Sequence, residues 1–234
     1  MSIVPRGRPP KVDHIREDFL EQIDAARRLV DAVVPLERIN GAGGLHPKHV
    51  FRSIELAFMG VCASWEDFLE ATMVRYLANA HTDSGHRPSL RLGSSQDIAH
   101  SYQLLSGKPD YDPENDYMTW TNPIAVTKLA KVFFIAGHPY AVPLTTANDS
   151  LKQAVKIRNR IAHGSELCKT QYHKAANTIR RLPEDEPLGQ GHRAGALLRE
   201  AAGPFFGAAI PAANITVFEA YMQLFERLAR SIVP

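Results

Sequence analysis

Residues 47–80 read PKHVFRSIELAFMGVCASWEDFLEATMVRYLANA, and this stretch decides the fold class. Its large apolar and aromatic residues recur every three or four positions, so they line one face of about eight turns of helix. These positions, together with one threonine, are Phe51, Ile54, Phe58, Val61, Trp65, Phe68, Thr72 and Tyr76. A face of this length indicates a helix that packs against other helices from end to end.

The same spacing predicts helices on both sides of this stretch. Before it lies one expected helix, at residues 13–34, which Pro35 ends. After it the pattern returns at residues 123–136, 150–163, 166–182, 193–202 and 214–232. No segment alternates convincingly between apolar and polar residues, as a half-buried strand would. The sequence therefore predicts an all-α fold, a helical bundle of four to five principal helices with an irregular insertion.

Three regions fall outside the helical pattern. Residues 1–12 are rich in proline and arginine and predict a flexible basic tail. Residues 82–122 contain many glycines and prolines, which indicates an insertion with at most short helices. An acidic loop at 183–191 begins a C-terminal extension. We therefore expect one domain over residues 13–234, with an insertion at about 82–122 and an extension after about residue 183.

Composition excludes several classes of protein. The two cysteines, Cys62 and Cys168, are too few for a disulfide framework or a thiolate zinc cage. No apolar run approaches the roughly 20 residues of a membrane helix, so we expect a soluble, cytoplasmic protein. Neither a dinucleotide fingerprint nor a recognised metal-ligand spacing is present, so we expect no cofactor and no metal. The net charge of +2 gives no indication of nucleic-acid binding by itself.

The segment with the most chemical information is residues 151–164, LKQAVKIRNRIAHG. Its expected apolar stripe consists of Leu151, Ala154, Val155, Ile161 and Ala162. Arg158 falls inside this stripe, where a charged side chain needs a partner. The shoulder of the stripe is polar and consists of Lys156, Asn159 and His163, while Arg160 is expected to face solvent. These residues also fit a structural role, with Arg158 in an ion pair and His163 favoured by the helix dipole.

The run Arg158-Asn159-Arg160-Ile161-Ala162-His163 resembles the R-x4-6-H motif of the HEPN superfamily of small α-helical domains, in its shortest spacing. Residues 63–70, ASWEDFLE, are similar to the aromatic-Glu-x-Phe stretch of the RiboL-PSP-like and stand-alone branches. The resemblance covers the helix order of residues 13–80 and 123–182. Ser165 stands where HEPN families that partner a nucleotidyltransferase often carry tyrosine, which counts against modification by such a partner.

This resemblance implies a metal-independent endoribonuclease that leaves 2′,3′-cyclic phosphate and 5′-hydroxyl ends. Such a reaction needs a base, an acid and a cation for the charged phosphorane. His163 can act as acid or base, and Arg158 and Asn159 can donate hydrogen bonds to phosphate. One chain supplies one histidine at this site, so a homodimer with a composite active site is expected. The resemblance further implies a toxin or defence effector, controlled by an antitoxin or another regulatory protein.

Two further residues are expected to support this site. Lys156 lies beside the motif, and Glu66 lies on the long helix in one row with Cys62, Leu69 and Met73. Glu66 can hold Arg158 in position, or it can be an exposed glutamate on the flank of its helix. These alternatives stay open at the level of sequence.

Other classes of function also stay open. A helical module that binds RNA or a protein without catalysis would keep the same scaffold. Residues 5–11, PRGRPPK, resemble an AT-hook core, so Arg6, Arg8 and Lys11 are candidates for binding DNA or RNA phosphates. The insertion also carries four aromatic residues that can either stack nucleobases or pack the insertion, namely Tyr102, Tyr111, Tyr117 and Trp120.

Overall fold

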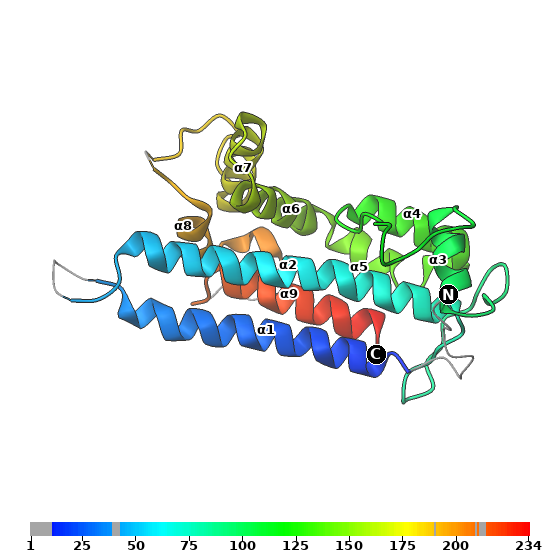
Figure 1. Cartoon of the computed structure of the whole chain (residues 1–234). Coiled ribbons are helices and arrows are strands. Elements are labelled where there is room, and N and C mark those ends of the chain that lie inside the picture. The colour runs from blue at the N-terminus through cyan, green and yellow to red at the C-terminus, as the bar shows by residue number, and fades with distance from the viewer. Residues whose placement is uncertain (1–10, 39–42, 190, 209, 211–213) are drawn as a thin grey trace. The chain divides into compact units, whose positions relative to one another are not determined.

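The computed structural model describes residues 11–38, 43–189, 191–208, 210 and 214–234. The helices in these ranges are α1 (Asp13–Val33), α2 (Pro47–Leu77), α3 (Ile98–Ser106), α4 (Pro123–Phe133), α5 (Ala141–Thr146), α6 (Asn148–Ala162), α7 (Glu166–Arg180), α8 (Ala194–Arg199) and α9 (Val217–Ile232) (Figure 1). Short 3-10 turns lie at Val34–Leu36, Ile135–Gly137 and Pro204–Phe206. The described part of the chain contains isolated β-bridges but no strand. The all-α prediction is therefore confirmed, and α1, α2, α6, α7 and α9 are the principal helices.

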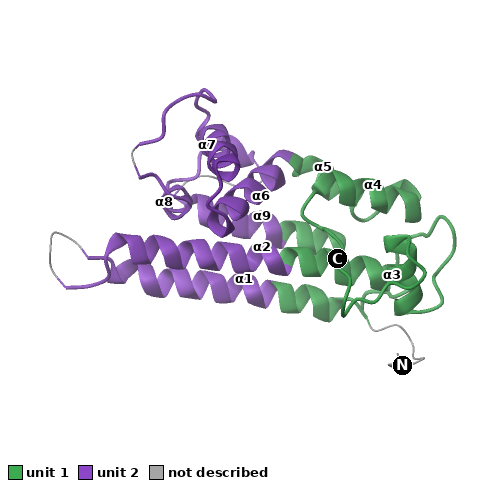
Figure 2. Ribbon diagram, turned by 45° about the horizontal axis from the view of Figure 1, so that its top comes forward, with its two compact units in different colours: residues 1–19, 65–148, 227–234 green, residues 20–64, 149–226 purple. Residues whose placement is uncertain are grey.

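The helices divide into two compact units (Figure 2). Unit 1 contains the described part of residues 1–19 with residues 65–148 and 227–234. Unit 2 contains the described parts of residues 20–64 and 149–226. The boundaries fall within α1, α2 and α9, so each of these helices contributes to both units. The expectation of one domain over residues 13–234 stays a prediction.

Unit 2 is centred on aromatic side chains between α2 and α9. The ring of Phe58 on α2 meets the ring of Tyr221 on α9 edge to face, with centroids 5.3 Å apart. The ring of Phe206 also meets the ring of Tyr221 edge to face, with centroids 4.9 Å apart. At the margin of this core, Arg27 of α1 donates hydrogen bonds of 3.0 and 2.8 Å to the carboxylate of Glu219 on α9. Apolar contact and a charge-assisted pair thus hold three helices side by side in this unit.

In unit 1 the second half of α2 is held by hydrogen bonds from buried hydroxyl groups. Tyr140, which lies just before α5, donates to the hydroxyl of Thr72 at 3.0 Å. Tyr76 donates to the backbone carbonyl of Ile232 at 3.1 Å. The ring of Phe68 stacks on Phe19 of α1 at 5.2 Å. Burial of these polar groups costs little free energy because each has a partner.

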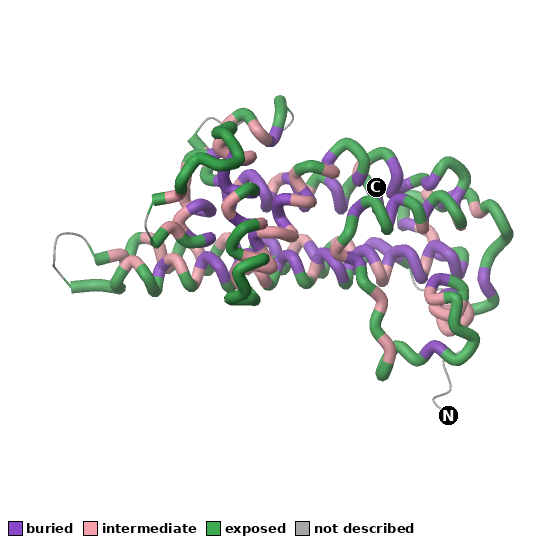
Figure 3. Tube along the Cα trace, turned by 90° about the horizontal axis from the view of Figure 1, so that it is seen from above, coloured by how far each residue is buried: buried purple, intermediate pink, exposed green. Residues whose placement is uncertain are grey.

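The face of α2 predicted from the sequence is buried over most of its length (Figure 3). Ile54, Phe58, Val61, Trp65, Phe68, Thr72 and Tyr76 are all buried, and Phe51 is half-buried. No helix in the described ranges has both the length and the apolar character needed to span a membrane.

The region around α5 differs from the prediction. The expected helix at 123–136 ends at Phe133, since Phe134 is extended (φ −111°, ψ 143°) and Ala136 has a positive φ of 55°. A second helix, α5, then forms at Ala141–Thr146 and was not predicted, because six residues are too few to show periodicity. α6 begins at Asn148 rather than at Ser150. The helix expected at 193–202 is also shorter, and only Ala194–Arg199 is helical.

We expect Gly195→Ala to destabilise unit 2 by about 1–3 kcal/mol. Gly195 lies in α8, and a β-carbon there would lie 2.7 Å from the Cα atom of Phe51 and even closer to its carbonyl oxygen. The backbone of α2 cannot move without a large cost in free energy, so α8 would have to shift.

The control is Gly60→Ala, where an added β-carbon has no neighbour within 4 Å. Gly60 lies within α2 and is exposed, so alanine should stabilise the helix by about 0.5–1 kcal/mol. Chemical denaturation of both variants measures the difference.

Candidate functional site

The buried face of α6 is rotated from the one predicted. Its buried residues are Leu151, Gln153, Ala154 and Ile157, whereas Val155 and Ile161 are half-buried and Ala162 is exposed. The prediction of burial is therefore confirmed for Leu151 and Ala154 and was wrong for Val155, Ile161 and Ala162. The reason is Gln153, whose side-chain oxygen accepts a hydrogen bond of 3.1 Å from Lys156 and can therefore be buried at low cost. A polar residue on the buried face is not visible in a hydrophobic pattern.

The rotation changes the positions of the two motif arginines. Arg158 lies at the flank of the buried face and is half-buried rather than enclosed. Its guanidinium donates a hydrogen bond of 3.2 Å to the side-chain oxygen of Asn159. Arg160 is half-buried rather than fully solvent-facing, and it donates to the backbone carbonyl of His163 at 3.3 Å. Both arginines are therefore tied to neighbours within the motif.

His163 occupies the first position after α6, with its side chain exposed. Its backbone amide donates to the carbonyl of Asn159 at 2.8 Å, so it continues the helical register. Lys156, Asn159 and His163 consequently share the face of α6 opposite its buried face. The structure thus brings three of the predicted site residues together on one accessible face, and the hydrogen bond to Asn159 joins Arg158 to them.

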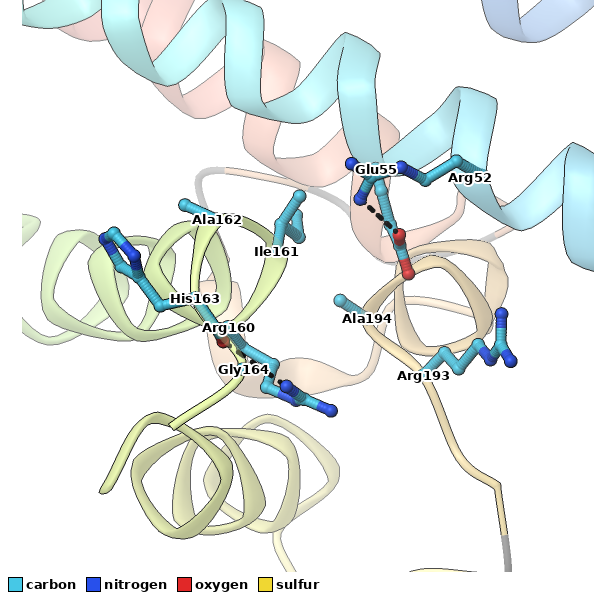
Figure 4. Close-up of a pocket in the computed structure, with 9 residues that line it drawn as sticks. All are labelled: Arg52, Glu55, Arg160, Ile161, Ala162, His163, Gly164, Arg193 and Ala194. Atoms are coloured by element: carbon cyan, nitrogen blue, oxygen red, sulfur yellow. Dashed lines mark hydrogen bonds and ion pairs between the residues drawn. The ribbon is translucent and has the colours of Figure 1, made fainter. Parts of the chain in front are cut away.

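A cavity of about 310 Å³ lies beside this helix end, within unit 2 (Figure 4). Arg52 and Glu55 contribute to it from α2, Arg160 and His163 from the end of α6, and Arg193 from the residue before α8. In Figure 4 Glu55 points into the space between the helices, while the imidazole of His163 points away from it. The cavity is therefore lined from three separate segments of the chain.

The charge balance of this cavity is positive. Three arginines line it, against the carboxylate of Glu55. Glu55 is 9% exposed, accepts a hydrogen bond of 3.1 Å from the backbone amide of Gly195 and pairs with Arg52 at 3.2 Å. One arginine is therefore neutralised, and Arg160 and Arg193 leave a net positive charge. Guanidinium groups in a concave site favour phosphate or carboxylate ligands.

Sequence reasoning missed Arg52, Glu55 and Arg193. Glu55 carries a usable signal, because it lies in the same row of α2 as Cys62 and Glu66, at helical intervals of seven and eleven residues. A carboxylate in a mostly apolar row indicates a buried polar contact. Arg52 and Arg193 give no such signal, since only folding brings them near residue 160.

A hydrogen-bonded network fixes the segment that carries Arg193. The hydroxyl of Tyr172 on α7 lies 2.9 Å from Nδ1 of His192, and Nε2 of His192 lies 3.0 Å from Glu200. Arg180 donates to Glu200 at 2.7 Å through Nε and again through a second nitrogen. Burial alone would raise the pKa of Glu200, but the hydrogen bonds from Arg180 and His192 outweigh it and hold this pKa below its ordinary value. The network joins α7 to both ends of α8.

The remaining predicted residues lie elsewhere. Glu66 belongs to unit 1, is 8% exposed and accepts a hydrogen bond of 3.0 Å from the hydroxyl of Tyr117. The alternative of an exposed glutamate is therefore wrong, and its orienting role toward Arg158 stays a prediction. Lys11 is exposed and forms an ion pair with Asp83. Arg6 and Arg8 lie outside the described residues.

Comparisons of this chain with protein-family models, with curated proteins and with solved structures find no match. Within the described ranges, no group of three or more His, Cys, Asp or Glu residues is placed to hold a metal ion. The functional assignment therefore depends on the chemistry of the residues at the end of α6 and around its cavity.

We expect Glu200→Gln to lower the stability of unit 2 at pH 7, because the charged partner of Arg180 is lost. The loss should be only on the order of 1 kcal/mol, because Glu200 is partly exposed to solvent. A carboxyl group whose pKa is lowered in the folded protein contributes stability above its unfolded pKa, and this contribution is lost as the pH falls through the folded value. The difference from the parent protein should therefore shrink toward about pH 3.

Urea unfolding of the parent protein and the variant at pH 7 and at about pH 3 measures how their difference in stability changes. Glu21→Gln is the matched control, since Glu21 is exposed on α1. A penalty for Glu200→Gln that stays constant between the two pH values would contradict the role of its charge.

Proposed function

We propose that this protein is an endoribonuclease of HEPN type, which binds RNA at the end of α6 and cleaves it without a metal ion. The observation that carries the proposal is an exposed histidine, His163, at the rim of an arginine-lined cavity. The R-x4-H spacing of residues 158–163 supports the same assignment through its family resemblance.

The first step in this proposal is the binding of the RNA backbone. Arg160 and Arg193 line the cavity with positive charge that Glu55 does not neutralise. Lys156 adds a further cation on the outer face of α6, next to Asn159 and His163. RNA carries one negative charge per nucleotide, so a few cations on one surface can bind it although the net charge of the chain is only +2.

The second step is transesterification. The 2′-oxygen attacks the adjacent phosphorus as a base removes its proton, and the bond from phosphorus to the 5′-oxygen breaks as an acid protonates that oxygen. His163 supplies acid–base chemistry near neutral pH. Arg158, steadied by its hydrogen bond to Asn159, donates to the phosphorane oxygens. The products are a 2′,3′-cyclic phosphate and a 5′-hydroxyl.

Two copies of the chain complete this chemistry. Each chain contributes one His163, whereas the reaction uses one base and one acid at the same time. His163 lies on an exposed face at the end of its helix, where a second copy can approach. In a homodimer the two imidazoles would face one shared phosphate, with one histidine as base and the other as acid.

We expect His163→Ala and Arg158→Ala each to reduce RNA cleavage by about 10²–10⁴-fold, with cleavage by the parent protein unaffected by EDTA. The control for the histidine is His14→Ala, because His14 is exposed on α1 in the other unit. Labelled RNA of several sequences serves as substrate, and the ends of the products identify the cyclic phosphate.

Loss of cleavage in EDTA would overturn the metal-independent mechanism. RNA binding without cleavage in the parent protein would favour the non-catalytic RNA-binding module. Unchanged cleavage in His163→Ala would remove the histidine from the mechanism.

We expect Arg193→Ala to weaken RNA binding in the His163→Ala background. A lost phosphate contact should reduce the slope of log affinity against log salt concentration by about 0.7 for a single strand. Arg28→Ala is the matched control, since Arg28 is an exposed arginine on α1 within the same unit. Fluorescence anisotropy of a labelled RNA at several salt concentrations measures both slopes, and equal slopes would exclude Arg193 from the binding surface.

A further inference from the structure

The four aromatic residues of the insertion have different environments in unit 1. Tyr111 and Trp120 are buried, and the rings of Tyr102 and Tyr111 stack with centroids 5.6 Å apart. Tyr102 and the indole nitrogen of Trp120 both donate to the carboxylate of Glu70 on α2. These three residues therefore pack the insertion onto α2.

Tyr117 is the exception, because it is 72% exposed. Its hydroxyl nevertheless donates a hydrogen bond of 3.0 Å to the buried carboxylate of Glu66. The ring is thus held at its polar tip while most of its surface meets solvent. An aromatic ring fixed in this way loses little conformational entropy when a planar ligand stacks on it.

Tyr117 lines a cavity of about 330 Å³ in unit 1, a volume at the lower end of those that hold small ligands. Leu105 at the end of α3 and Leu129 on α4 contribute apolar surface. Trp120 forms part of the wall, and Lys108 brings a primary amine. That amine pairs with Asp116 at 3.1 Å, and the pair is open to solvent.

Unpaired backbone groups lie at the same cavity. Met118 and Thr119 line it, and no hydrogen bond within the described residues satisfies their backbone amide or carbonyl groups. A ligand with both donors and acceptors on one edge can pair with these groups. A purely aliphatic ligand would instead leave them without partners and remove them from water, which costs free energy.

We propose that this cavity binds one nucleobase of single-stranded RNA, stacked on Tyr117, with its edge toward the backbone of Met118 and Thr119 and its phosphate near Lys108. Flat aromatic rings, unpaired backbone groups and the solvent-exposed amine of Lys108 match the three parts of a nucleotide. The base must be unpaired, because stacking on a protein ring requires it to leave a duplex. This proposal rests on the proposed function for the choice of RNA as ligand.

The test measures binding by the full chain in the His163→Ala background, so that the RNA stays intact. Trp65→Phe is added, because the chain has two tryptophans and Trp65 stacks on Phe68 away from the cavity. The fluorescence of Trp120 then reports on the cavity wall. The probes are an eight-nucleotide oligoadenylate, the same strand in a duplex, and adenosine monophosphate.

We expect the single strand to quench Trp120 and Tyr117→Ala to weaken its binding by about five- to a hundredfold, the value of one base–aromatic stack. Tyr117→Phe keeps the ring and removes the hydroxyl that bonds to Glu66, so its loss of affinity should be smaller. Leu92→Ala is the matched control for an exposed apolar side chain, since Leu92 is 74% exposed and outside the cavity.

If Tyr117→Ala and Leu92→Ala bind the single-stranded oligoadenylate with equal affinity, the proposal is overturned. Binding of the monophosphate as tightly as the oligonucleotide would overturn the assignment to RNA, and equal binding of the duplex would overturn the requirement for an unpaired base. Failure of the ribonuclease proposal gives a different result, because the parent protein would then leave RNA intact while the effect of Tyr117→Ala on binding persists. If only the nucleobase proposal is wrong, the parent protein should cleave RNA and Tyr117→Ala should cleave it with the same KM.

Discussion

Carboxylates buried along α2 constrain what packs around that helix. A charged group taken from water must receive hydrogen bonds, or its burial costs several kcal/mol. In unit 2 Glu55 obtains them from Arg52 and the backbone amide of Gly195. In unit 1 the buried Glu66 accepts from Tyr117, and the half-buried Glu70 accepts from two aromatic residues of the insertion. The insertion and the C-terminal extension, which lie outside the long helical pattern, therefore donate hydrogen bonds to the glutamates of α2.

The long helices could be predicted because each repeats its apolar spacing over several turns. Shorter features could not, since α5 has six residues and shows no period. The buried face of α6 was misplaced for a different reason, because Gln153 is polar and buried through a bond to Lys156. The R-x4-H motif was visible as a local spacing. The contributions of Arg52 and Arg193 to the cavity come from distant segments, and no local pattern contains that information.

The two cavities place different chemistry in the two units. The cavity in unit 2 is lined by guanidinium groups, which suit a phosphate, and the exposed imidazole of His163 lies at its rim and suits a proton transfer. The cavity in unit 1 is lined by aromatic and apolar side chains with one amine, which suits a flat ring. Backbone charge and unpaired bases are two of the features by which proteins recognise RNA. In our proposals each property is recognised by its own unit.

The bond between Glu55 and Gly195 also bears on how this chain can change during evolution. Glu55 accepts from a main-chain amide, which every residue except proline provides. Most side chains of the C-terminal extension can therefore vary without loss of this anchor. Position 195 is the exception, because α2 leaves no room there for a β-carbon. A glycine should therefore be retained at this position among related sequences, while the surrounding extension diverges.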